Sequence, residues 1–273
     1  MANCINCNQE VSTAYCPACG QRNPVNKINV ANVWSDFVSR TYGFDGMFPR
    51  TLKDLTIRPG QVAREYIIGN RVKYYGPVGY FFLMLTLYLL LASLLEIDLV
   101  TFMMQTNPTN LETQGGGVQE IVREITQWTI DNMRSVSFFI TLFTVFFTWL
   151  FFKKSKYNFI ETGALVFFVT GHFMWVSIVL IVIYKISGFT LDSSYLFFFS
   201  IMFMIYAFAD FYSHLSKWKI VIKGIIVHIL SYVTLTIFIV VVFIYQVSHD
   251  KELYEKIKPS NNKPKVEQSP EVK

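Results

Sequence analysis

Charged side chains are scarce in this 273-residue chain. Asp, Glu, Lys and Arg make up 16% of it, against about 25% in an average soluble domain. Hydrophobic residues make up 52%, including 26 Phe and 15 Tyr. A large soluble helical protein would carry a polar face along each helix, and the segment from Tyr195 to Tyr206 has almost no polar residue. The shortage of charge therefore excludes an ordinary soluble fold.

The familiar catalytic motifs are also missing. The chain has no Gly-x-Ser-x-Gly turn, no phosphate-binding glycine-rich loop, no His-Glu-x-x-His helix and no cysteine after residue 19. Acidic and basic residues outside the apolar segments show no diagnostic spacing. We therefore predict no catalytic residue, and an enzyme that acts on lipid stays as an alternative.

Five apolar segments are long enough to cross a membrane as helices, which takes about 20 residues each. They are Pro77–Leu95, Val136–Phe152, Gly163–Tyr184, Tyr195–Tyr212 and Ile222–Tyr245. Charged residues separate them, and Tyr or Trp flanks several of their ends, as interfacial aromatics do. We predict an all-α integral membrane protein whose bundle of about five transmembrane helices occupies residues 77–247.

Lysine and arginine are distributed unevenly between the two sides of these segments. The region up to Gly76 has nine, and the four loops that follow have two, three, one and two, with Lys223 just inside the fifth segment. Because Lys and Arg favour the cytoplasmic side, we predict that the N-terminus and the second and fourth loops are cytoplasmic. No cleavable signal peptide precedes the first span, so that span is expected to act as the insertion signal.

The segment 248–273 is rich in Pro, Lys and Glu without apolar periodicity, which predicts a disordered tail. Five spans place this tail outside the cytoplasm, although it holds six lysines. A bundle of four or six spans would place it inside, and this alternative stays open.

The first nineteen residues hold every cysteine of the chain: Cys4, Cys7, Cys16 and Cys19. Two Cys-x-x-Cys pairs can each present two thiolates from one tight turn and together close a tetrahedral zinc site. Gly20 and Asn8, which follow the pairs, tolerate the left-handed backbone that such turns use. An iron site of the rubredoxin or [2Fe–2S] type uses similar ligands, and two disulfides would require an oxidising compartment.

We predict that residues 1–26 form a zinc-ribbon knuckle with zinc as its cofactor. Because four thiolates fill the coordination shell, water and substrate have no open position, and a structural role is expected. The head is basic but lacks the stacked aromatic residues of nucleic-acid modules, so no nucleic-acid partner is expected. The expected partners are a cytosolic protein and anionic lipid headgroups.

Residues 27–76 lead from the knuckle to the first span. Helical spacing of apolar residues over Ile28–Arg40, Phe44–Leu55 and Ile57–Ile68 predicts short amphipathic helices along the cytoplasmic membrane face. A further amphipathic helix is predicted from Val118 to Met133, on the outer surface before the second span.

Three arginines of this region are candidates for contact with a phosphate or a lipid headgroup: Arg58, Arg64 and Arg71. A helix that starts at Pro59 would add backbone donors beside the guanidinium groups. The alternative is an ordinary positive-inside anchor whose charges are solvated.

Ionisable residues inside predicted spans are costly and indicate function. His172 lies near the middle of the third span, Asp210 near the cytoplasmic end of the fourth and His228 early in the fifth. Asp210 and His228 are expected at similar depth, where they could pair, relay protons, bind a cation or line a polar cavity. The alternative is a neutral histidine bonded to a neighbouring helix and an aspartate that reaches the interface.

Three strings carry a family resemblance: Tyr15–Gln21 (YCPACGQ), Phe48–Leu55 (FPRTLKDL) and Arg58–Arg71 (RPGQVAREYIIGNR). With the first cysteine pair they resemble a family of uncharacterised bacterial membrane proteins, common in Bacteroidetes. The resemblance covers roughly residues 4–85. It implies a zinc-ribbon-like head on a helix bundle in the bacterial inner (cytoplasmic) membrane, and it implies no established activity.

Two functions follow from these observations. A closed metal site on a bundle without catalytic motifs favours a membrane-anchored adaptor or assembly factor. The intramembrane polar residues favour, as the alternative, a transporter or channel-like protein for an ion, small molecule or lipid, regulated by the zinc head.

Overall fold

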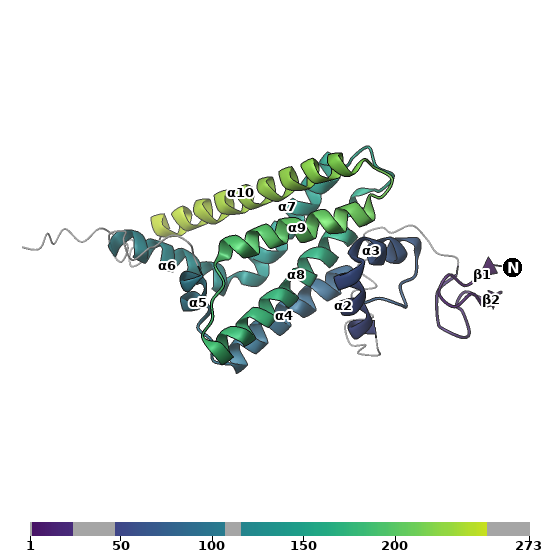
Figure 1. Ribbon diagram of the computed structural model, residues 1–273, viewed down its shortest axis with the longest axis horizontal. Coiled ribbons are helices and arrows are strands. Elements are labelled where there is room, and N and C mark those ends of the chain that lie inside the picture. The colour runs from purple at the N-terminus through teal and green to yellow at the C-terminus, as the bar shows by residue number, and fades with distance from the viewer. Residues whose placement is uncertain (1, 24–46, 107–115, 250–273) are drawn as a thin grey trace, which may run out of the picture.

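The computed structural model describes residues 2–23, 47–106 and 116–249 (Figure 1). In this part of the chain the elements are β1 Ala2–Asn3, β2 Glu10–Val11, α2 Met47–Ile57, α3 Pro59–Ile68, α4 Pro77–Leu94, α5 Leu99–Gln105, α6 Gly116–Asp131, α7 Met133–Phe151, α8 Phe159–Ser187, α9 Ser193–Phe211 and α10 Lys217–His249. The predicted helix Ile28–Arg40 and nearly all of the predicted tail lie outside the described residues.

Five helices, α4, α7, α8, α9 and α10, are long and apolar enough to cross a membrane. The prediction of a multi-pass helical membrane protein is therefore confirmed. Two of the helices are longer than the apolar segments that predicted them, with 29 residues in α8 and 33 in α10. A 33-residue helix is about 50 Å long, whereas the hydrocarbon core is about 30 Å thick. The ends of α10 must therefore project beyond the apolar layer.

Local capping explains why α8 begins before the apolar segment does. Asn158 and Glu161 form a capping box, in which each side chain accepts a hydrogen bond from the other's backbone amide, at 2.8 and 2.9 Å. The helix ends at Gly188, which adopts a left-handed φ of 68°. Hydropathy locates the buried part of a helix, while capping decides where its hydrogen-bonded backbone starts and stops.

Helix α8 lies at the centre of the bundle, with α4 packed along one side and α7 along another. Helix α10 packs on α7 and α9 (Figure 1). A glycine sets the closest approach, because a Cβ added to Gly171 of α8 would lie 2.8 Å from Phe81 Cα on α4. Small residues of this kind let membrane helices pack at short distance.

The helices α2 and α3 pack against α8, and α3 also packs against the C-terminal turn of α9. Both helices fall where short amphipathic helices were predicted, but much of their surface contacts the bundle. Helix α6 overlaps the predicted Val118–Met133 helix, but it starts two residues earlier, at Gly116, and ends at Asp131. Helix α5 was not predicted; Asp98 begins it by accepting a hydrogen bond from the Val100 amide at 3.0 Å.

Candidate functional site

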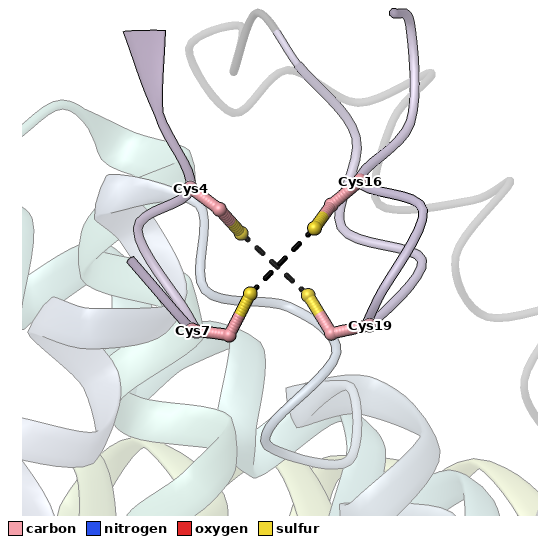
Figure 2. Close-up of side chains that lie close together, drawn as sticks. All are labelled: Cys4, Cys7, Cys16 and Cys19. Carbon is pink, nitrogen blue, oxygen red and sulfur yellow. Dashed lines mark hydrogen bonds between the residues drawn. The ribbon is translucent and has the colours of Figure 1, made fainter. Parts of the chain in front are cut away.

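The four cysteine sulfurs converge on one point between two turns (Figure 2), and all lie within 4.8 Å of one another. The Cys4 and Cys19 sulfurs are 3.5 Å apart, and those of Cys7 and Cys16 are 3.6 Å apart. A tetrahedral site with metal–sulfur bonds of about 2.3 Å places its sulfurs about 3.8 Å apart. All four thiols are free, and their sulfurs are too far apart for disulfide bonds. The four residues can therefore hold one metal ion.

The same turn geometry occurs twice in the head. The Asn8 amide donates to the Cys4 carbonyl at 2.8 Å, and the Gly20 amide donates to the Cys16 carbonyl at the same distance. Asn8 has a φ of 59° and Gly20 a φ of 71°, as the sequence predicted for the residues after each pair. Strands β1 and β2, paired antiparallel from Ala2 to Val11, hold the first turn in place.

The thiols differ in how readily they ionise. The Asn6 side chain, followed by the Gln21 amide, lowers the pKa of the Cys19 thiol to about 6. The Gln9 backbone also lowers the pKa of the Cys7 thiol. Loss of solvent and the neighbouring sulfurs outweigh this effect and raise the pKa of Cys7 to about 12. Four thiolates at this spacing repel one another, and a bound cation would remove that repulsion.

The head contacts the helical body through Gln21, the residue that ends the YCPACGQ string. Its side-chain amide donates to the carbonyl oxygen of Gly69, and the side chain is buried. Gly69 ends α3 with a φ of 120°. The Gln21 carbonyl in turn accepts from the Cys16 amide at 2.7 Å. The second cysteine turn and the end of α3 are therefore connected through one residue.

At the other end of α3, Asp210 of α9 contacts the N-terminus of the helix. Its Oδ2 accepts from the Gln61 backbone amide at 2.8 Å, and its Oδ1 accepts from Arg64 Nη2 at 3.1 Å. Arg64 also donates to the Asp210 carbonyl. The N-cap residue of α3, Arg58, makes no side-chain cap of its own. Asp210 of α9 therefore supplies the capping acceptor from a distant part of the chain.

This junction leaves no room beside Gly60. A Cβ added there would lie 2.3 Å from the Phe211 nitrogen and 2.8 Å from the Ala207 carbonyl oxygen. Both atoms are backbone and cannot rotate away. The Pro59-Gly60 pair therefore starts the helix and allows its first turn to rest on α9.

A second group of contacts links α2, α3 and the segment after α3. The Tyr74 hydroxyl lies 3.0 Å from Asp54 Oδ2 and 3.1 Å from Glu65 Oε2. Arg58 pairs with Asp54 at 3.1 Å, and Lys73 pairs with Glu65 at 2.7 Å. Together with the α9 junction this forms the juxtamembrane polar cluster: Asp54, Arg58, Gln61, Arg64, Glu65, Lys73, Tyr74 and Asp210.

Burial and hydrogen bonding shift the pKa values within the cluster. Burial raises the pKa of Glu65, but hydrogen bonds from Lys73 and Gln61 outweigh it and hold the pKa below the usual 4.5. Burial, and then the bond to Asp54, raise the pKa of Tyr74 well above the usual 10. At neutral pH the cluster therefore contains a charged Glu65 beside a neutral phenol.

Acid should weaken the fold through Glu65. Because its folded pKa lies below 4.5, its stabilising effect is complete above that pH and is lost as pH falls through the folded value. We expect Glu65→Gln to reduce the acid-induced fall in melting temperature of the detergent-purified protein, with an effect of about 1 kcal/mol. Glu120→Gln, at a partly exposed position of α6, is the matched control and should follow the wild type. Parallel profiles for all three proteins would contradict the prediction.

His172 joins three helices. Its Nδ1 lies 2.9 Å from the Tyr80 hydroxyl of α4, and its Nε2 lies 3.1 Å from Thr56 Oγ1 of α2. Thr56 donates its proton to the Leu52 carbonyl, so it must accept from Nε2–H, and Tyr80 must donate to Nδ1. The side chain is buried. These contacts are those of a neutral histidine bonded to neighbouring helices.

Asp210 and His228 are not brought together. Asp210 faces α3, as described above, whereas His228 of α10 lies 3.1 Å from Ser200 Oγ of α9. The three arginines are separated as well. Arg58 pairs with Asp54 and Arg64 with Asp210, while Arg71 lies over the Tyr66 ring, 5.8 Å from its centroid. They do not form a single cluster of cations.

Sequence reasoning missed the acceptors of the cluster, Asp54 and Glu65, and the hydroxyl of Tyr74. A partial signal was present, because Gln61 and Glu65 are spaced four residues apart on α3, and Asp54 and Arg58 have the same spacing at the end of α2. No local signal identifies Asp210 as the cap of α3, because Asp210 and Gln61 are 149 residues apart in the chain.

The model of a family described as a protein of unknown function (DUF3667) matches residues 45–89. This stretch includes α2, α3 and most of α4, and with them most of the polar cluster. It supports the resemblance to an uncharacterised domain over this part of the chain. No curated protein and no solved structure matches the chain.

Proposed function

We propose that this protein is a membrane-anchored adaptor or assembly factor, whose cysteine head holds one structural zinc ion and docks a partner protein at the cytoplasmic face of a bacterial inner membrane. The observation that carries the proposal is the closed set of four sulfurs, all within 4.8 Å of one another. A site with four protein ligands stabilises a fold and leaves no position for a reaction.

The residues that would hold zinc are Cys4, Cys7, Cys16 and Cys19, and the ion would supply cross-linking of the two turns. A small head of about two dozen residues has little apolar core, so it depends on such a cross-link. Its core contains Cys4, Cys16 and Val11 with Cys19 against them. The zinc-bearing head then presents its remaining surface to a partner.

The distribution of Lys and Arg supports the cytoplasmic placement of the head. A reducing cytosol would keep the four thiols available to metal. Exposed basic side chains near the membrane surface attract anionic lipid by about 1 kcal/mol each. Arg58 and Arg64 already pair with carboxylates, so lipid contact by these residues would have to compete with those pairs.

The polar cluster supports a fixed position of the cysteine head and of α2 and α3 relative to the helix bundle. It joins α2 and α3 to α9, and Gln21 joins the head to the end of α3. A permeation role has weaker support. Asp210, which the sequence offered as a proton or cation site, is occupied by Arg64 and the Gln61 amide, and His172 is occupied by Tyr80 and Thr56.

Cross-linking in native membranes followed by quantitative mass spectrometry tests this proposal. The Cys16→Ser/Cys19→Ser double variant should lose a defined subset of the proteins that co-purify with the wild type. Ser12→Ala, an exposed head substitution outside the metal ligands, should retain them. An identical set of partners for all three proteins would refute the adaptor role. Loss of function confined to Asp210→Asn and His172→Ala would instead favour permeation.

A further inference from the structure

A cavity of about 910 Å³ lies inside the bundle, bordered by α7, α8, α9 and α10 and by residues of α4, α5 and α6. This volume is near the upper end of the range for organic ligand pockets, about 300–1,000 Å³. The cavity is partly open, and its wall includes Phe198 and Tyr232, whose side chains are exposed. Both residues belong to candidate spans, and we infer that their exposed side of the cavity faces lipid.

The wall carries no formal charge in the part of the chain that the structure describes. None of its described residues is Asp, Glu, Lys or Arg, and the titratable ones are Tyr88, His228 and Tyr232. Much of the remaining wall is aromatic, with Phe173, Phe197 and Phe203 among its members. A charged ligand would lose its hydration here without gaining a counter-ion. The wall therefore suits an uncharged, largely apolar molecule.

Several hydroxyl groups of the wall have already used their protons, and among them are the ones nearest His228. Each of six donates to a backbone carbonyl of its own helix, at 2.7 to 2.8 Å: Thr129, Thr141, Thr144, Thr170, Ser200 and Ser231. A hydroxyl that donates in this way still has lone pairs with which to accept. These six positions therefore offer acceptors to a ligand in the cavity.

The contact between Ser200 and His228 follows the same rule. Ser200 Oγ lies 3.1 Å from His228 Nε2 and donates its own proton to the Phe197 carbonyl. It must therefore accept from Nε2–H, which leaves Nδ1 of the neutral imidazole as an acceptor. A ligand that matches this wall carries a hydrogen-bond donor and no charge.

We propose that the cavity binds an uncharged lipid with a free hydroxyl group, of the diacylglycerol class. Its acyl chains would lie against the aromatic wall and its hydroxyl would donate to the acceptors beside Ser200 and His228. The size of the cavity, its exposed side on candidate spans, its lack of charge and its acceptors beside Ser200 and His228 all point to this class. The inference goes beyond the adaptor role and does not depend on the metal head.

Photo-crosslinking of the full-length protein in phosphatidylcholine nanodiscs tests the proposal. The probe is a diacylglycerol with a diazirine in one acyl chain, and labelled peptides are mapped by mass spectrometry. We expect labelling to concentrate on wall residues of α8, α9 and α10 and to be displaced by unlabelled diacylglycerol. A competitor whose free hydroxyl is methylated should displace it about fivefold less well, the effect of one hydrogen bond.

Ser177→Phe, which fills the cavity from α8, should abolish the displaceable labelling. Val179→Phe is the matched control, because Val179 lies two residues away on the same helix and is exposed. Melting curves show whether Ser177→Phe folds. If it does not fold, the displacement experiments on the wild type still test the proposal. Uniform labelling of exposed helix faces, equal displacement by the methylated competitor, or equal labelling by a phosphatidylglycerol probe would each overturn the proposal.

Discussion

The Cys16→Ser/Cys19→Ser double variant should lose its metal ion and its folded head while the helix bundle keeps its melting temperature. Binding of a structural zinc ion is worth about 10–16 kcal/mol in small zinc domains at neutral pH, and the head has only a minimal core of its own. The bundle has a separate and far larger core, which includes Phe168 and Phe208. The loss of the ion should therefore stay local.

Elemental analysis of the purified full-length protein is the direct measurement. We expect one zinc per chain for the wild type and for Ser12→Ala, and none for the double variant. Stoichiometric iron would contradict the choice of metal, and the absence of any metal from the wild type would contradict the site.

Thiol alkylation gives a second measurement, because the chain has no cysteine outside the head. Modification by a maleimide should be slow in the wild type and fast after addition of a zinc chelator. A membrane-impermeant maleimide should fail to label intact cells and should label them after permeabilisation with chelator present. Labelling of intact cells would place the head on the other side of the membrane.

Gly60→Ala should destabilise the protein by about 3 kcal/mol, which is the upper part of the usual range for overpacking. The added methyl carbon would lie 2.3 Å from the Phe211 nitrogen, and the α9 backbone cannot relieve the contact by a rotamer change. Relief requires α3 to move away from α9, and that movement would stretch the Arg64–Asp210 pair and the Gln61 cap.

Gly163→Ala is the matched control for this substitution. It also places a methyl group on a helical glycine, but the nearest atom there is a Val145 side-chain carbon at 3.6 Å, an ordinary contact. It should leave stability unchanged or raise it by up to about 1 kcal/mol through helix propensity. Tryptophan-fluorescence melting in detergent measures both variants. Equal melting temperatures for Gly60→Ala and the wild type would show that α3 does not rest on α9 as described.

Much of the architecture was predictable because membranes impose simple rules on sequence. A spanning helix must be apolar over about 20 residues. This requirement concerns only one continuous segment at a time, and it was enough to locate all five candidate spans. The cysteine turns were predictable for a related reason, since ligand spacing within a turn is a local property. Helix ends were less accurate. The Asn158–Glu161 capping box was present in the sequence, but hydropathy alone placed the start of the span at Gly163.

The polar residues were assigned less well because their partners are distant in sequence. The sequence suggested Arg64 as a candidate for lipid contact and Asp210 as a candidate intramembrane site. In the structure the two residues form one ion pair between α3 and α9. His172 is similar, since Thr56 and Tyr80, which set its tautomer, come from two other helices.

By itself the sequence determined that this protein is a bundle of about five membrane-crossing helices with a four-cysteine head, because both properties depend on short-range composition and spacing. Only the tertiary structure decided what the charged and polar residues do. It closed the sulfurs to within 4.8 Å, turned Asp210 into the cap of α3 and left a cavity of about 910 Å³ among hydroxyl-bearing helices. The physical reason is that ion pairs, caps and cavities form between helices, whose approach no single segment encodes.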